Sequence, residues 1–229
     1  MSSRFLREAW LDALAVLLPV ECAGCGADDR TLCDPCRATL EPVVTRRDVG
    51  GFAVWAGLEY DGVARSVTLA LKAQQRVDAA RALAPALSEA VRAAVDDCAG
   101  GPGVIDVVAI PGTRAAYRRR GYEPVRLLIA RTGLRERRVF AAARPHRAQK
   151  QLAVDERDRN LRGAFRVRPS IWSSHPVSGR RVLLIDDVVT TGATLREAAR
   201  VLREGGAEVV GAAVVASTLR RDGTTEGVL

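Results

Sequence analysis

The chain has 229 residues, of which 48% are hydrophobic, so it can bury one complete core together with a small appendage. Its formal net charge of +8 favours anionic partners such as phosphates, nucleic acid or a membrane surface, without choosing among them. Aromatic residues make up only 4% of the chain, which argues against a platform that stacks the bases of a single strand.

An apolar run over residues 9–20 follows Arg4 and Arg7 and precedes Cys22, an order also found in lipoprotein signal peptides. Glu21 stands where such a cleavage site needs a small residue, and the run is too short to span a bilayer. Its apolar residues recur at helical spacing: Phe5, Leu6, Ala9, Trp10, Ala13, Leu14 and Leu17. We therefore expect an amphipathic helix packed on the protein itself, with membrane-surface binding as the alternative. We expect no transmembrane segment and a cytoplasmic location.

Two C-x-x-C pairs follow, Cys22 with Cys25 and Cys33 with Cys36, separated by seven residues. Four such thiolates can close tetrahedrally around one Zn²⁺ and leave no open position for catalysis. Disulfides are disfavoured without an export signal, and a thioredoxin-like redox site needs only one such pair. We therefore predict a structural zinc module within residues 1–47, followed by a second domain over 48–229.

Strands and helices alternate along the middle of the chain. The sequence predicts a strand over 52–60, helices over about 62–72 and 77–97, a strand over 104–110, a helix from Pro124 to Gly133 and a short strand near 138–141. The buried face expected for the second helix consists of Ala80, Ala84, Leu87, Val91, Ala94 and Val95. This alternation predicts an α/β fold with a mainly parallel sheet flanked by helices.

Basic side chains stand at the end of one of these elements and directly after another. Lys72 ends an apolar helix, where it either contacts a phosphate or complements the helix dipole. Arg114 and the run Arg118–Arg120 follow the strand at 104–110, at the sheet edge where a pyrophosphate would lie. Guanidinium groups bind phosphate oxygens in pairs, but a solvated basic turn is at least as good an interpretation for any single arginine.

The most informative segment runs from Val182 to Thr194. Four aliphatic residues, 182–185, predict a buried parallel strand, and Asp186 and Asp187 stand where that strand ends. A loop rich in threonine and glycine, 190–194, then opens a helix that stops at Gly205, before a last strand over 209–216. Backbone N–H groups at a helix N-terminus favour a phosphate, and carboxylates accept hydrogen bonds from a ribose diol. A sugar phosphate is therefore the predicted ligand. A P-loop NTPase is not supported, because the sequence contains no G-x-x-x-x-G-K-[ST] motif.

This segment resembles the phosphoribosyl-pyrophosphate (PRPP) motif of type I phosphoribosyltransferases, in which the two acids hold the ribose and the loop holds the 5′-phosphate. Nearly the whole chain also resembles the ComF family of competence-associated proteins. Besides the motif, the matching pieces are the two C-x-x-C pairs, Tyr60-Asp61-Gly62 to Lys72, Ile110-Pro111 to Arg120-Gly121-Tyr122, and Gln149 to Phe165. One departure is Glu123-Pro124, where that family usually has Asn-Gln.

The resemblance implies a pyrophosphate loop at 111–114 and a flap over the site at 144–160. The residues expected to hold Mg²⁺·PRPP are Lys72, Pro111, Gly112, Thr113, Asp186, Asp187, Thr190, Thr191, Gly192, Ala193 and Thr194. Those expected to act in the transfer are Arg114, Arg120, Arg157, Asp186 and Asp187.

Two functions are compatible with these features. The first is a phosphoribosyltransferase that binds Mg²⁺·PRPP or a nucleotide 5′-phosphate and releases pyrophosphate, a reaction that needs positioning and charge neutralisation more than a protein nucleophile. The second is a non-catalytic PRPP sensor or an adaptor in natural transformation, with single-stranded DNA and a competence helicase as partners implied by the resemblance. No motif in the sequence names the acceptor base.

Overall fold

The computed structural model describes residues 20–28, 30–98, 101, 103–141, 163–168 and 177–218. The helix expected before Cys22, and the expected flap over 144–160 with Arg157, lie outside these residues. Among the described residues, no helix combines the length and apolar composition needed to cross a membrane.

The elements follow in the order α2 (Asp34–Ala38), β1 (Thr45–Asp48), β2 (Ala53–Glu59), α3 (Gly62–Ala73), α4 (Ala79–Asp97), β3 (Ile105–Ala109), α5 (Arg114–Arg120), α6 (Pro124–Thr132), β4 (Arg181–Val189), α8 (Ala193–Glu204) and β5 (Glu208–Ser217). The strands form one sheet in the order β1-β2-β5-β4-β3, in which only β1 is antiparallel to its neighbour. The predicted α/β fold with a mainly parallel sheet is confirmed.

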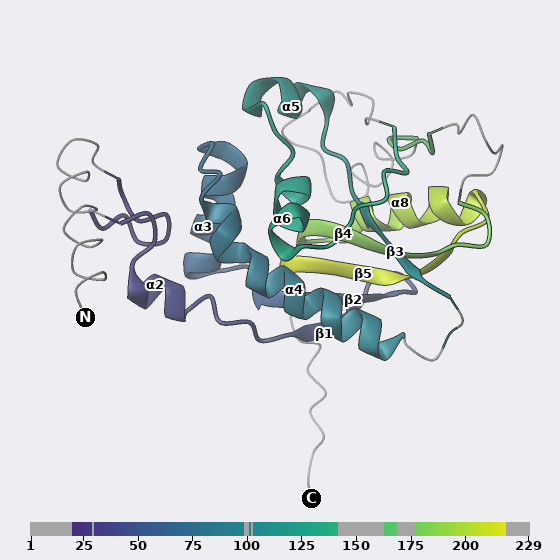
Figure 1. Cartoon of the computed structure of the whole chain (residues 1–229), viewed down its shortest axis with the longest axis horizontal. Coiled ribbons are helices and arrows are strands. Elements are labelled where there is room, and N and C mark those ends of the chain that lie inside the picture. Colours follow the sequence, from purple (N-terminus) through teal and green to yellow (C-terminus); the bar gives the residue numbers. More distant parts are fainter. Residues whose placement is uncertain are drawn as a thin grey trace, which may run out of the picture.

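Helices cover both faces of the sheet (Figure 1). Alternate residues of β4 face opposite ways, so Leu183 and Ile185 join the core under α3, α4 and α6, while Val182 and Leu184 join the core under α8. All four are fully buried, as expected for a central parallel strand. The backbone of α4 packs so closely on β2 that a Cβ at Gly57 would lie 2.2 Å from the Ala86 carbonyl oxygen.

Three expectations need correction. The strand near 138–141 is reduced to one isolated bridge between Phe140 and Val167. Val95 is 38% exposed, because it lies in the last turn of α4 at the margin of the buried stripe. The motif strand does not end at residue 185 but continues to Val189, because its backbone stays paired with β5.

The region around the cysteines is attached to the sheet through β1, a strand that the sequence did not indicate. The boundary expected at residue 47 falls inside β1. Cys22, Leu32, Cys36 and Leu40 belong to the same buried cluster as α3 and α4. The cysteine segment thus shares the main hydrophobic core.

Candidate functional site

Strand β4 carries the two aspartates into the carboxyl edge of the sheet. Asp187 follows Leu183 and Ile185 in the alternation, so it lies on the face that α3 covers. Its Oδ1 atom is 2.8 Å from Nζ of Lys72, and its side chain is only 9% exposed. Asp186 accepts a hydrogen bond from the Asp187 N–H through Oδ1 at 2.8 Å, which fixes the first carboxylate against its own strand.

Burial and charge set the ionisation of this group of side chains. Burial raises the pKa of Asp186 well above its usual range, the Asp187 charge raises it further, and Lys72 opposes both effects. Burial lowers the pKa of Lys72, but the Asp187 carboxylate outweighs this effect and the pKa is raised overall. Lys72 therefore stays a cation, and Asp186 takes up a proton more readily than an exposed aspartate unless another cation enters the site.

The loop after β4 has a shape that requires glycine. Gly192 has φ of 72° and precedes the first residue of α8, and a Cβ there would lie 1.9 Å from Cγ1 of Val49. Thr190 and Thr191 are exposed on this loop, and the Oγ1 atom of Thr191 accepts a 3.4 Å hydrogen bond from the Ala193 N–H. The loop thus presents hydroxyl and N–H groups to solvent at the N-terminus of a twelve-residue helix, where an anion is favoured.

The neighbouring strand β3 leads into a loop and the helix α5, which lie beside the aspartates of β4. Ile110 continues the ladder with an N–H bond of 2.8 Å to the Ile185 carbonyl, so Pro111 and Gly112 begin beside Asp186. Thr113 caps α5 by accepting a 3.1 Å hydrogen bond from the Ala116 N–H. The basic segment, for which a phosphate site and a solvated turn are the two expectations, is therefore a short helix.

Arg120 and Tyr122 connect this part of the site to α3. Arg120 Nη1 donates to the Lys72 carbonyl at 3.3 Å, and the Tyr122 hydroxyl donates to the Leu71 carbonyl. These bonds satisfy the last carbonyls of α3 and so fix the helix end that carries Lys72. The buried Nε atom of Arg120 has no hydrogen-bond partner in the described part of the chain.

These elements enclose a cavity of about 280 Å³. Of the predicted residues, those that line it are Lys72, Pro111, Gly112, Arg120, Asp186, Asp187 and Thr194. Thr113, Arg114, Thr190, Thr191, Gly192 and Ala193 are not among the lining residues, and Arg114 is exposed. Sequence motifs do not assign to the site five further lining residues: Ile110, Glu123, Pro124, Val125 and Val188. Glu123-Pro124 is the pair at which the chain departs from the ComF pattern.

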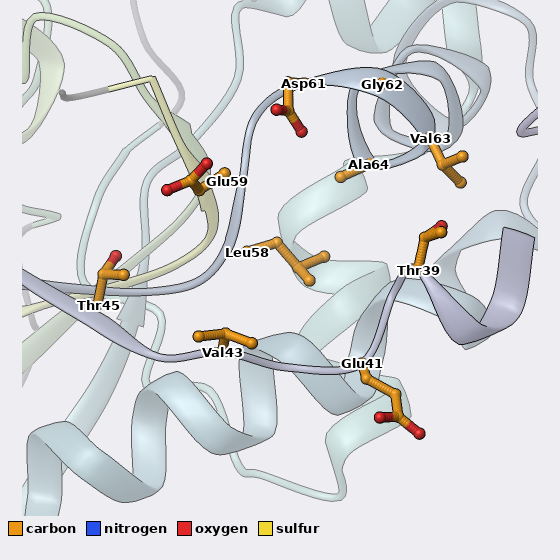
Figure 2. A pocket seen from close by; sticks show the side chains of 10 residues that line it. All are labelled: Thr39, Glu41, Val43, Thr45, Leu58, Glu59, Asp61, Gly62, Val63 and Ala64. Carbon is orange, nitrogen blue, oxygen red and sulfur yellow. The ribbon is translucent and has the colours of Figure 1, made fainter. Parts of the chain in front are cut away.

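A larger cavity, of about 500 Å³, lies between the segment after α2 and the start of α3. Figure 2 shows its lining, which includes the carboxylates of Glu41, Glu59 and Asp61 and no basic side chain. Three acids without a cation repel a phosphate, whereas Lys72 and Arg120 of the smaller cavity attract one. The smaller cavity is therefore the candidate for an anionic ligand.

The four predicted cysteines come together away from this cavity. Their Sγ atoms all lie within 4.8 Å of one another, with Cys22 to Cys33 at 3.6 Å and Cys25 to Cys33 at 3.7 Å. Sulfurs about 2.3 Å from a central Zn²⁺ would be roughly 3.8 Å apart in a tetrahedron, so the arrangement fits a metal ion.

Backbone donors favour a thiolate at the first cysteine. The N–H groups of Gly24 and Cys33 each donate to Cys22 Sγ at 3.4 Å. Burial raises the pKa of Cys22, but these hydrogen bonds outweigh it and lower the pKa to about 6. Arg76 donates to the carbonyls of Glu21 and Thr31 at 2.9 and 3.1 Å, and so ties this segment to the turn between α3 and α4.

Comparison with known proteins supports this description. Residues 136–226 match the family described as "Phosphoribosyl transferase domain". The chain is 32% identical over 109 residues to "DNA utilization protein YhgH" of Escherichia coli (strain K12), covering 45% of each chain.

Two adenine phosphoribosyltransferases are also similar. Identity to that of Mycobacterium tuberculosis (strain ATCC 25618 / H37Rv) is 59% over 39 residues, covering 17% of this chain and 18% of the other. Identity to that of Mycobacterium marinum is 34% over 127 residues, covering 56% and 63%. The chain thus spans less than two thirds of the length of each of these three relatives. The matches, the parallel sheet and the four-cysteine cluster together support a ComF-like protein with a type I phosphoribosyltransferase domain.

Proposed function

We propose that the chain binds Mg²⁺·PRPP in the cavity beside Asp186 and Asp187 and transfers the phosphoribosyl group with loss of pyrophosphate. The observation that carries the proposal is that one cavity gathers both aspartates, Lys72, Arg120 and the start of the loop after β3. These residues come from four separate parts of the chain. Their chemistry matches a ligand with a diol at its centre and a phosphate at each end.

Each part of the ligand has a matching group in the protein. The 5′-phosphate would lie on the loop that opens α8, and the ribose hydroxyls would donate to Asp186 and Asp187. The pyrophosphate would extend toward Gly112 and Arg120, whose buried Nε atom has no hydrogen-bond partner within the described residues. Mg²⁺, when bound with the substrate, would neutralise part of the pyrophosphate charge.

The chemical step needs no protein nucleophile. A nitrogen of the acceptor bonds to C1 while the C1–O bond breaks, and pyrophosphate leaves with the bonding electrons. The proton released by the nitrogen passes to the departing pyrophosphate. What the protein supplies is position, together with positive charge from Lys72 and Arg120 where negative charge develops.

Calorimetric titration with Mg²⁺·PRPP tests the binding site. Wild-type protein should bind with micromolar affinity, and an Asp186→Asn, Asp187→Asn double variant should lose binding at least a hundredfold. Glu59→Gln, which removes a carboxylate from the larger cavity instead, is the matched control and should bind as wild type does. Equal binding by the double variant and the wild type would refute the proposal.

We further propose that the four-cysteine cluster holds one structural Zn²⁺. Its support is the set of sulfur distances and the absence of any disulfide among the described cysteines. Four protein ligands leave no position for substrate, so this metal would stabilise the fold and take no part in transfer. The proposal places the protein in the cytoplasm, where thiols stay reduced.

A second candidate function is DNA binding by an adaptor. Its specific support is α5, on which Arg114, Arg118, Arg119 and the half-exposed Tyr117 face solvent, together with the relative that is named for DNA utilization. Binding of a single-stranded oligonucleotide that weakens steeply with salt, and that survives the double aspartate substitution, would favour the adaptor. A competence helicase as partner stays a prediction from the ComF resemblance.

A further inference from the structure

Glu123 places a third carboxylate in the wall of the PRPP cavity. It lies between α5 and α6, directly before Pro124, and lines the cavity with Arg120, Asp186 and Asp187. Its side chain is 13% exposed, so little water reaches it. A buried carboxylate beside a binding site for phosphates is electrostatically unfavourable unless it serves another part of the reaction.

The carboxylate of Glu123 keeps most of its capacity to accept hydrogen bonds. Within the described residues its ion-pair partner is Arg126, whose Nη1 is 3.6 Å from Oε2, too far for a hydrogen bond. Arg126 instead donates through Nε to Glu136 at 2.9 Å. The Oε2 atom is buried and has no hydrogen-bond partner within the described residues. Glu123 is thus held in place by charge while an acceptor atom remains unused.

We propose that Glu123 selects the acceptor by receiving a hydrogen bond from an N–H group of an uncharged nitrogen heterocycle, and that it excludes acceptors that carry a carboxylate. The inference rests on the proposed function, because it assigns the substrate class of the same site. A carboxylate accepts a hydrogen bond from an N–H donor and repels a second carboxylate electrostatically. Like charges about 6 Å apart at an effective dielectric constant near 20 would change affinity by roughly tenfold to a hundredfold.

Product nucleotides make suitable probes, because they contain the ribose phosphate and the base together. With full-length, zinc-loaded protein and Mg²⁺, calorimetry measures the affinity for AMP and the affinity for orotidine 5′-monophosphate, and the first is divided by the second to give an affinity ratio. Wild type should bind AMP at least tenfold more tightly than orotidine 5′-monophosphate. In Glu123→Gln the ratio should fall to within about threefold of one, mainly through tighter binding of orotidine 5′-monophosphate.

Glu136→Gln is the matched control. It removes the other carboxylate partner of Arg126, yet Glu136 does not line the cavity, so the ratio should stay as in wild type. A wild-type ratio near one, or equal changes in the two variants, would overturn the assignment of Glu123. Mg²⁺·PRPP affinity is measured in parallel and should be kept or tightened in Glu123→Gln. Failure of wild type to bind PRPP and both nucleotides would instead reject the proposed function.

Discussion

Asp186 is a residue whose charge lowers the stability of the free protein but suits it to bind a ligand. Asp186 is half-buried next to the Asp187 charge, and both conditions disfavour its ionised form. Lys72 offsets this only in part, since its ammonium group contacts Asp187. The carboxylate is therefore strained electrostatically in the free protein, in a position where a ligand that brings hydroxyl donors and a cation would relieve it.

Asp186→Asn should stabilise the free protein at pH 7.5 while it weakens PRPP binding. The folded-state pKa of Asp186 is raised, so the folded protein binds that proton more tightly than the unfolded chain does, and stability is lost as pH rises through the folded pKa. The advantage of the variant should accordingly vanish below about pH 4. Urea unfolding at several pH values measures the difference in unfolding free energy between the variant and wild type. A variant less stable than wild type at pH 7.5 would contradict this prediction.

Lys72→Met is the complementary change. It leaves Asp187 buried without its cation, so unfolding free energy should fall by about 1 to 3 kcal/mol at neutral pH. PRPP affinity should drop at least tenfold, because a positive charge is lost from the cavity. Lys72→Arg keeps the charge and should recover part of both effects. Unchanged stability and affinity in Lys72→Met would show that the ion pair has no role.

At the scale of elements, the start of α8 is fixed by backbone shape as much as by side chains. Gly192 lies in the left-handed region and against Val49, so any side chain there meets two penalties. Gly192→Ala should cost about 2 to 4 kcal/mol of stability. Adding Val49→Ala should relieve the clash but not the backbone strain, and so restore only part of the loss. Full recovery in the double variant, measured by urea unfolding, would show that the left-handed conformation is not required.

The elements that the sequence predicted well are those whose burial pattern is local. The aliphatic run of β4 indicates a strand, and the periodic leucines and alanines of α8 indicate a helix, from the local sequence alone. By contrast, β1 reads Thr-Arg-Arg-Asp, a polar stretch that becomes a strand only because β2 supplies an edge. The bonds from Arg120 and Tyr122 to the end of α3 span about 50 residues, so no local pattern could indicate them. The position of Glu123 in the cavity wall depends on the same long-range packing.

In the molecule as a whole, the cysteine segment and the α/β domain share one hydrophobic core. Cys22 and Cys36 are each 4% exposed and pack with residues of α3 and α4. Loss of Zn²⁺ should therefore lower the Tm of the entire domain, rather than loosen a separate tail. Thermal unfolding with and without a strong chelator, together with a zinc content near one per chain, checks this. An unchanged Tm after complete removal of the metal would contradict it.

If the carboxyl edge of β3 and β4 is a phosphoribosyl site, a crystal structure of the protein with Mg²⁺·PRPP should show the ligand bound there. We predict the ribose hydroxyls on Asp186 and Asp187, the 5′-phosphate on the loop 190–194, and the pyrophosphate beside Gly112 and Arg120. PRPP in the larger acidic cavity, or no ligand in a well-ordered protein at saturating concentration, would contradict the account.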